Sequence, residues 1–171
     1  MFRGMGVAAI AILSATSAGA AIEGAGPAGF TAVETAHVAA PPDRTYAMLV
    51  QPARWWNPRH TFSGDAANLA LDARAGGCWC ETLPGGGSVE HLRVIYVVPG
   101  KTLRLTGALG PLQPLPVLGV LTFALTPAGE GTDVKVTYAL AGAGLGDLSG
   151  PVDNVLADQT ARLKAAVETA R

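Results

Sequence analysis

Charged side chains are scarce in this chain, and neither sign is in marked excess. Of 171 residues, 12 are lysine or arginine and 13 are aspartate or glutamate, and they form no run of like charge. A nucleic-acid-binding surface needs basic residues clustered on one face, so the composition argues against a nucleic-acid partner. The same scarcity argues against a charged tail and against a patch that binds anionic membranes.

Cysteine is nearly absent, since the chain has only Cys78 and Cys80. Two potential ligands at that spacing are a weak metal signal compared with paired CxxC motifs. Internal repeats and linkers are absent as well. Hydrophobic residues, by contrast, make up 49% of the chain, which is enough to build a sizeable core in one domain.

The first twenty residues have the pattern of an export signal. Arg3 gives a short positive segment, the apolar run VAAIAIL follows at 7–13, and a small-x-small triplet ends at Ala20. The sequence therefore predicts cleavage after Ala20 and a flexible segment over 21–29. We expect a periplasmic or secreted protein with no stable membrane insertion after cleavage. The alternative is an uncleaved anchor, because the uncharged stretch approaches the ~20 residues needed to cross a bilayer.

The remaining residues, 30–171, are predicted to form one α+β domain. Alternating apolar positions bounded by Gly-rich and Pro-rich turns predict seven strands. These cover 30–38, 68–72, 78–83, 88–98, 102–107, 120–125 and 133–140. Prolines after the first strand begin two short helices, and an apolar stripe predicts a long helix over 151–170. A curved seven-stranded antiparallel sheet cannot bury its concave face alone. We therefore expect it to wrap around the long C-terminal helix, as in the helix-grip fold, with a cavity between them.

Three segments resemble the SRPBCC superfamily, which includes START lipid-transfer domains, pollen-allergen-like proteins and polyketide cyclases. They are ETAHVAAPPDRTYAMLVQPARWWN at 34–57, GGCWCETLPGGGSVEHLRVIYVVPGKTLRLTG at 76–107, and GTDVKVTYALAG at 131–142 followed by the C-terminal helix. The resemblance implies the helix-grip fold. It does not choose a function, because the superfamily holds both carriers and enzymes on one scaffold.

Most of the chemically capable side chains fall in one predicted hairpin with a Pro-Gly-Gly-Gly turn. In one register His91 lies opposite Cys80, which gathers Cys78, Cys80 and His91 on one face. A one-residue slip places His91 opposite Glu81, and glycine-rich turns specify register poorly. We expect the slipped register, because it keeps Glu81 from facing Glu90. The Glu81–His91 pair is then either a proton relay or an ion pair at the rim.

Cys78 and Cys80 point to the same face of their strand because they lie two residues apart. An extended pair at this spacing lies near the ~7 Å limit between Cα atoms that a disulfide can span. We therefore expect two half-buried thiols used in packing. A disulfide formed in an oxidising compartment stays open, as does a metal or redox site with His91 as a third ligand.

The cavity wall is expected to come from inward-facing sheet positions and from aromatic residues near the mouth. One of Trp55 and Trp56 should pack into the core while the other lines the site. Gln159 interrupts the apolar stripe of the last helix, and it either contacts a ligand or marks the edge of that stripe. The uncharged segment 107–119 is a lid, a contact surface for a partner or membrane, or a loop over the end of the core. The predicted ligand-contacting residues are Trp55, Trp56, Trp79, Leu105, Leu121, Phe123, Tyr138 and Gln159.

Together these features favour an exported protein that binds a small hydrophobic molecule in its cavity, without a cofactor and without catalysis. Two alternatives stay open. One is a polyketide-cyclase-type enzyme in which Glu81 and His91 act as acid and base. The other is a thiol-based metal or redox protein that uses Cys78 and Cys80.

Overall fold

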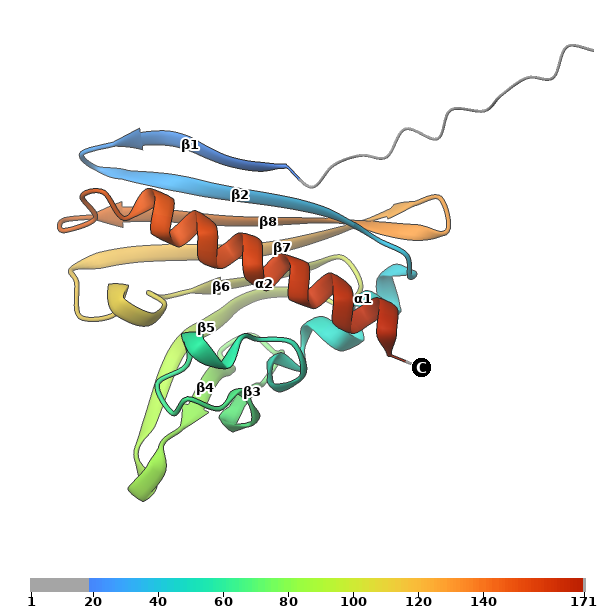
Figure 1. Ribbon diagram of the computed structural model, residues 1–171, viewed down its shortest axis with the longest axis horizontal. Helices are drawn as coiled ribbons and strands as arrows, with labels where there is room; N and C mark the ends of the chain where they lie inside the picture. The colour runs from blue at the N-terminus through green and yellow to red at the C-terminus, as the bar shows by residue number, and fades with distance from the viewer. Residues whose placement is uncertain (1–18, 171) are drawn as a thin grey trace, which may run out of the picture.

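The computed structural model describes residues 19–170, which form one eight-stranded antiparallel sheet and a long helix that crosses it (Figure 1). The strands are β1 (Ala20–Gly26), β2 (Gly29–Val38), β3 (Leu69–Leu71), β4 (Cys78–Thr82), β5 (Ser88–Val98), β6 (Thr102–Thr106), β7 (Val117–Ala128) and β8 (Gly131–Gly142). The helices are α1 (Pro42–Leu49) and α2 (Ser149–Thr169), with short 3-10 turns between strands. The strand order is β1-β2-β8-β7-β6-β5-β4-β3. Within the described residues no helix is long and apolar enough to span a bilayer.

The core lies between α2 and the sheet. Figure 1 shows the strand direction turning from β1 towards β4, so the sheet curves around the helix. Leu156, Leu163 and Val167 of α2 are buried against it. The inward-facing sheet positions that bury with them include Leu103, Leu105, Leu121, Phe123, Val134, Val136 and Tyr138. The predicted arrangement of an antiparallel sheet around a C-terminal helix is therefore confirmed in outline.

The eighth strand is β1, at a place where the sequence predicts a flexible segment. Ala20–Gly26 pairs antiparallel with β2, and Ala21 lies opposite Val33. The sheet thus begins at Ala20 rather than at residue 30. Alanine and glycine are depleted in strands, so this segment has little strand propensity of its own and depends on pairing with β2. The predicted signal sequence at 1–20 lies almost wholly outside the described residues.

The two short helices predicted after the strand at 30–38, which is β2, differ in kind. The first is α1, with Pro42 in its first turn. The second is only a 3-10 turn at Pro52–Arg54, and Trp55 and Trp56 follow it instead of lying on it. Two further 3-10 turns, at Pro58–His60 and Ala66–Asn68, lead to β3. This irregular stretch forms one side of the candidate site.

The β4–β5 hairpin contains a bulge that neither predicted register includes. The observed pairs are Cys78–Arg93, Trp79–Leu92, Cys80–Glu90 and Glu81–Val89. His91 is the extra residue, and both His91 and Leu92 are buried on the core side. The expected slipped register is therefore wrong. The bulge separates the carboxylates in another way, because Glu81 lies opposite Val89 while Glu90 stays on the outer face.

Candidate functional site

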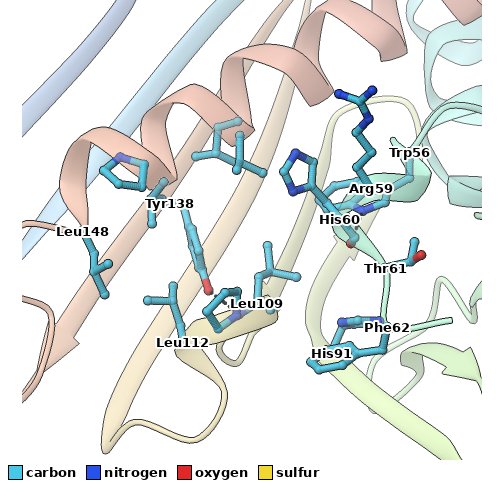
Figure 2. A pocket seen from close by; sticks show the side chains of 16 residues that line it. Trp56, Arg59, His60, Thr61, Phe62, His91, Leu109, Leu112, Tyr138 and Leu148 are labelled. Atoms are coloured by element: carbon cyan, nitrogen blue, oxygen red, sulfur yellow. Dashed lines mark hydrogen bonds between the residues drawn. The ribbon is translucent and has the colours of Figure 1, made fainter. Parts of the chain in front are cut away.

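A cavity of about 460 Å³ lies between the first half of α2 and the curved sheet (Figure 2). Its volume falls within the range of small-molecule pockets. Side chains reach it from the irregular segment 56–62, from β5, from the turn at 109–112, from β8 and from α2. Most of them are apolar.

The apolar stripe of α2 serves two purposes along its length. Val152, Val155 and Leu156 lie at the spacing of one helical face and line the cavity. Leu163 and Val167, farther along the same stripe, are buried in the core. The sequence predicts the stripe correctly but does not indicate where packing ends and the cavity begins.

Tyr138 on β8 holds the turn that closes one side of the cavity. Its hydroxyl donates to the Gly107 carbonyl oxygen at 3.1 Å and accepts from the Leu109 backbone N–H at 3.0 Å. Burial raises the pKa of Tyr138 to about 12, although the bond from Leu109 opposes the rise, so the hydroxyl is neutral at physiological pH. The ring lines the cavity beside Leu109 and Leu112. The uncharged segment 107–119 therefore lines the cavity with its residues 109–112.

Glu81 and His91 form a buried pair beside the cavity. His91 Nε2 lies 2.8 Å from Glu81 Oε2, and the two side chains are 5% and 0% exposed. The pair does not need the slipped register, because the bulge turns His91 to the inner face where Glu81 already points. His91 lines the cavity, whereas Glu81 lies behind it.

The carboxylate of Glu81 also anchors the segment at the cavity rim. It accepts the backbone N–H of Phe62 at 3.0 Å and that of Ser63. Burial alone would raise the pKa of Glu81, but the hydrogen bonds from Ser63, Phe62 and His91 outweigh it and hold the pKa below its ordinary value. Glu81 is therefore an ionised carboxylate that fixes both the rim and the imidazole.

Phe62 lies at the rim itself. Its side chain is 53% exposed, and its ring centroid lies 5.8 Å from that of His91. Phe62 is therefore a large apolar side chain that meets both the solvent and the cavity.

The three tryptophans pack together next to the cavity. All are buried, and the rings of Trp56 and Trp79 lie 5.0 Å apart, edge to face. Trp55 donates its indole N–H to the Leu49 carbonyl oxygen at 3.2 Å. Both members of the Trp55–Trp56 pair are thus buried, and Trp56 lines the cavity.

Two of the eight predicted ligand-contacting residues, Trp56 and Tyr138, line the cavity. The other six are buried in the surrounding core, and their role as ligand contacts stays a prediction. They are Trp55, Trp79, Leu105, Leu121, Phe123 and Gln159. Gln159 Oε1 accepts the backbone N–H of Asn57 at 2.9 Å, which ties α2 to the segment carrying the tryptophans.

Arg59, His60 and Phe62 are cavity residues that the sequence analysis missed. They lie in an irregular segment without hydrophobic periodicity, so no pattern singled them out. Their position just after the Trp55–Trp56 pair, which the sequence places near the mouth, is the signal that could have found them.

Cys78 and Cys80 are joined by a disulfide, so the expected pair of free thiols is wrong. Their Cα atoms lie 5.3 Å apart, well within disulfide reach, at a point where the pairing of β4 with β5 is irregular. The alternative Cys78–Cys80–His91 cluster does not form, because His91 points to the inner face and the two sulfurs lie on the outer one. Glu90 is the carboxylate near the two sulfurs, and it pairs with Arg93.

Residues 30–168 match the family model described as polyketide cyclase / dehydrase and lipid transport. The chain belongs to this family. The match confirms the resemblance to the SRPBCC superfamily, and it covers β2 through nearly all of α2. No curated protein sequence matches the chain significantly.

Solved structures of similar fold span most of the chain. CV1439 from Chromobacterium violaceum is 22% identical, with a TM-score of 0.58, over 82% of this chain and 98% of that protein. A protein from Rhizobium leguminosarum is 20% identical, with a TM-score of 0.64, over 91% of this chain and 100% of its own. DynU16, a protein in the dynemicin biosynthetic locus, is 19% identical, with a TM-score of 0.59, over 81% of this chain and 47% of its own. At these identities the likeness shows the fold alone.

Proposed function

We propose that this member of the polyketide cyclase / dehydrase and lipid transport family binds a small hydrophobic molecule between α2 and the sheet. The supporting observation is the cavity of about 460 Å³, lined mainly by apolar side chains of α2 and of the turn at 109–112. Binding an apolar molecule there would remove Val152, Val155 and Leu109 from water, at roughly 25 cal/mol per Å² of apolar area. The family description includes lipid transport, which agrees with a carrier role.

Filling the cavity tests this proposal. Val155 faces the cavity from α2, and Val155→Trp would occupy it. Ile95→Trp provides the control, because Ile95 is an exposed side chain that does not line the cavity. We expect at least a tenfold loss of affinity for decanol in Val155→Trp and none in Ile95→Trp, measured by intrinsic tryptophan fluorescence and checked by calorimetry. Equal binding by wild type and Val155→Trp would contradict the proposed site.

A polyketide-cyclase-type enzyme is the second candidate, favoured by the Glu81–His91 pair. With Nε2 directed at the Glu81 carboxylate, a neutral imidazole would carry its proton there and leave Nδ1 as a base. Such a base could remove a proton from a carbon between two carbonyl groups, which begins an aldol ring closure. In this role Glu81 orients the imidazole and stabilises its protonated form, by the logic of a carboxylate–histidine pair.

The enzymatic alternative is tested with a poly-β-ketone analogue. His91→Gln should lower turnover by roughly 10²-fold or more while leaving affinity for the analogue nearly unchanged, because a positioned base typically contributes that much. Glu81→Gln should lower turnover as well, because an amide cannot stabilise the positive charge that the imidazole carries after it removes the proton. Turnover that is unchanged in both variants, or absent in wild type, would leave the carrier as the supported function.

A further inference from the structure

The basic side chains of the cavity gather on one side of it. Arg59 and His60 extend from the 3-10 turn at Pro58–His60, and His91 lies below them on β5. Figure 2 shows these residues opposite Leu148 and Tyr138. No aspartate or glutamate among residues 19–170 lines the cavity. The charged end is therefore basic, and the far end is apolar.

Most of the other polar groups around the cavity are already hydrogen-bonded to other groups of the protein. Both hydrogen-bonding capacities of the Tyr138 hydroxyl are used by Gly107 and Leu109. The Thr61 hydroxyl donates to the Pro58 carbonyl oxygen at 2.7 Å, and His91 Nε2 is held by Glu81.

Arg59 and His60 are different. Across residues 19–170, neither side chain makes a hydrogen bond or an ion pair, although Arg59 carries five N–H donors. These two side chains therefore supply unused donors at the cavity.

We propose that the ligand carries a carboxylate that binds Arg59 and His60, with its apolar part lying along α2 and the turn at 109–112. This inference rests on the proposed binding function and specifies its ligand class as apolar acids. The guanidinium group matches a carboxylate because two of its N–H donors align with the two oxygens. The opposite wall, with Leu112, Leu148 and Val152, offers only apolar contact.

The position of the basic residues also suits a charged group energetically. Arg59, His60 and Phe62 are exposed, so they stand at the mouth and not in the interior. A carboxylate bound there keeps part of its hydration, which avoids most of the cost of burying a charge. The apolar chain then enters first and reaches the region between Tyr138 and Val155.

Two ligands of equal chain length separate this inference from the proposed function. Decanoate and decanol differ only in the head group, and both are titrated below the concentrations at which they form aggregates. Wild type should bind decanoate about fivefold or more tighter than decanol. In Arg59→Gln that preference should fall to nearly none, because decanoate loses the partner of its carboxylate and decanol has no carboxylate to lose. Arg74→Gln is the matched control, because Arg74 is exposed, pairs with Asp72 and does not line the cavity.

The outcomes are distinguishable. A preference for decanoate that disappears in Arg59→Gln and persists in Arg74→Gln supports the inference. Equal affinity for both ligands in wild type, or a preference that Arg59→Gln leaves intact, overturns it while the hydrophobic site stands. Failure of wild type to bind either ligand overturns the proposed function and this inference together. Adding His60→Gln to Arg59→Gln and raising the salt concentration give a second readout, since both should weaken decanoate binding only.

Discussion

Glu34 on β2 and Asp153 on α2 bring two carboxyl groups together between the sheet and the helix. Glu34 is 3% exposed, and Oε1 of Glu34 and Oδ1 of Asp153 have no hydrogen-bond partner within the described residues. Burial raises the pKa of Glu34 from 4.5 to about 7, and the nearby charge of Asp153 adds to the rise. The folded protein therefore holds a proton near neutral pH that the unfolded chain has already lost.

This proton makes the free energy of unfolding depend on pH. Between pH 4.5 and about 7 the folded state binds more protons than the unfolded state, so stability falls as pH rises through that window. Glu34→Gln removes the ionisation while keeping the shape. We expect this variant to exceed wild type in melting temperature at pH 8 and to approach it at pH 4.

Thermal unfolding of the two proteins at pH 4, 6 and 8 provides the measurement. Glu23→Gln on β1 is the matched control, since Glu23 is exposed and its removal should leave the pH dependence as in wild type. A Glu34→Gln profile parallel to that of wild type would show that Glu34 ionises normally in the folded protein.

At the residue scale the sequence predicts which side chains carry chemistry better than it predicts their neighbours. The Glu81–His91 pair is expected from the sequence, yet for a register that does not occur. A bulge depends on how Leu92 and His91 both fit the core, which no local pattern in the hairpin shows. Arg59 and His60 cannot be predicted as cavity residues, because an irregular segment has no hydrophobic period that shows which side chains point inward.

The β4–β5 hairpin carries its disulfide and its candidate functional pair on opposite faces. The Cys78–Cys80 disulfide lies on its outer face, while Glu81 and His91 lie on its inner face. In the chain-entropy account, a disulfide that closes so short a loop contributes about 1.5 kcal/mol to the free energy of unfolding.

The double substitution Cys78→Ser with Cys80→Ser should therefore lower the free energy of unfolding modestly and leave decanol affinity within about twofold of wild type. Denaturant titration and fluorescence binding measure the two effects. Wild type treated with a reductant should lose the same amount of stability. Loss of binding in a folded serine variant would mean that the disulfide positions the cavity wall, contrary to this expectation.

Elements with a clear hydrophobic period are predicted well from the sequence. An element that forms only by pairing with a neighbouring strand is not. The bounds of β5 and α2 agree with the sequence prediction to within about two residues because their apolar patterns are long. The strand β1 has the sequence AAIEGAG, whose composition favours no strand, and only the edge of β2 makes it one.

For the whole molecule, the order of the elements is enough to predict a sheet wrapped around a C-terminal helix. It is not enough to locate the cavity, whose outline depends on two irregular segments, 56–62 and 109–112, that approach α2 from different parts of the chain. Contacts between such segments are set by tertiary packing and not by local sequence.

The cellular location of the whole protein is a prediction. We propose that the protein is exported, and both the disulfide and the predicted cleavage after Ala20 support this. Cleavage there would remove only the first residue of β1. Amino-terminal sequencing of the protein from its native host should find Ala21 first, in the periplasmic or extracellular fraction. Recovery of Met1 in the cytosolic fraction would contradict both parts of the prediction.

The two hydrogen bonds of the Tyr138 hydroxyl have a kinetic consequence. They pin the turn at 109–112, so a ligand leaving on that side would have to break both. On the other side the backbone of Phe62 is hydrogen-bonded to Glu81, whereas its side chain is exposed at the surface. Rotation of an exposed side chain takes picoseconds to nanoseconds, whereas loops move more slowly. Loading and unloading would then proceed past the Phe62 side chain, without breaking either hydrogen bond of Tyr138.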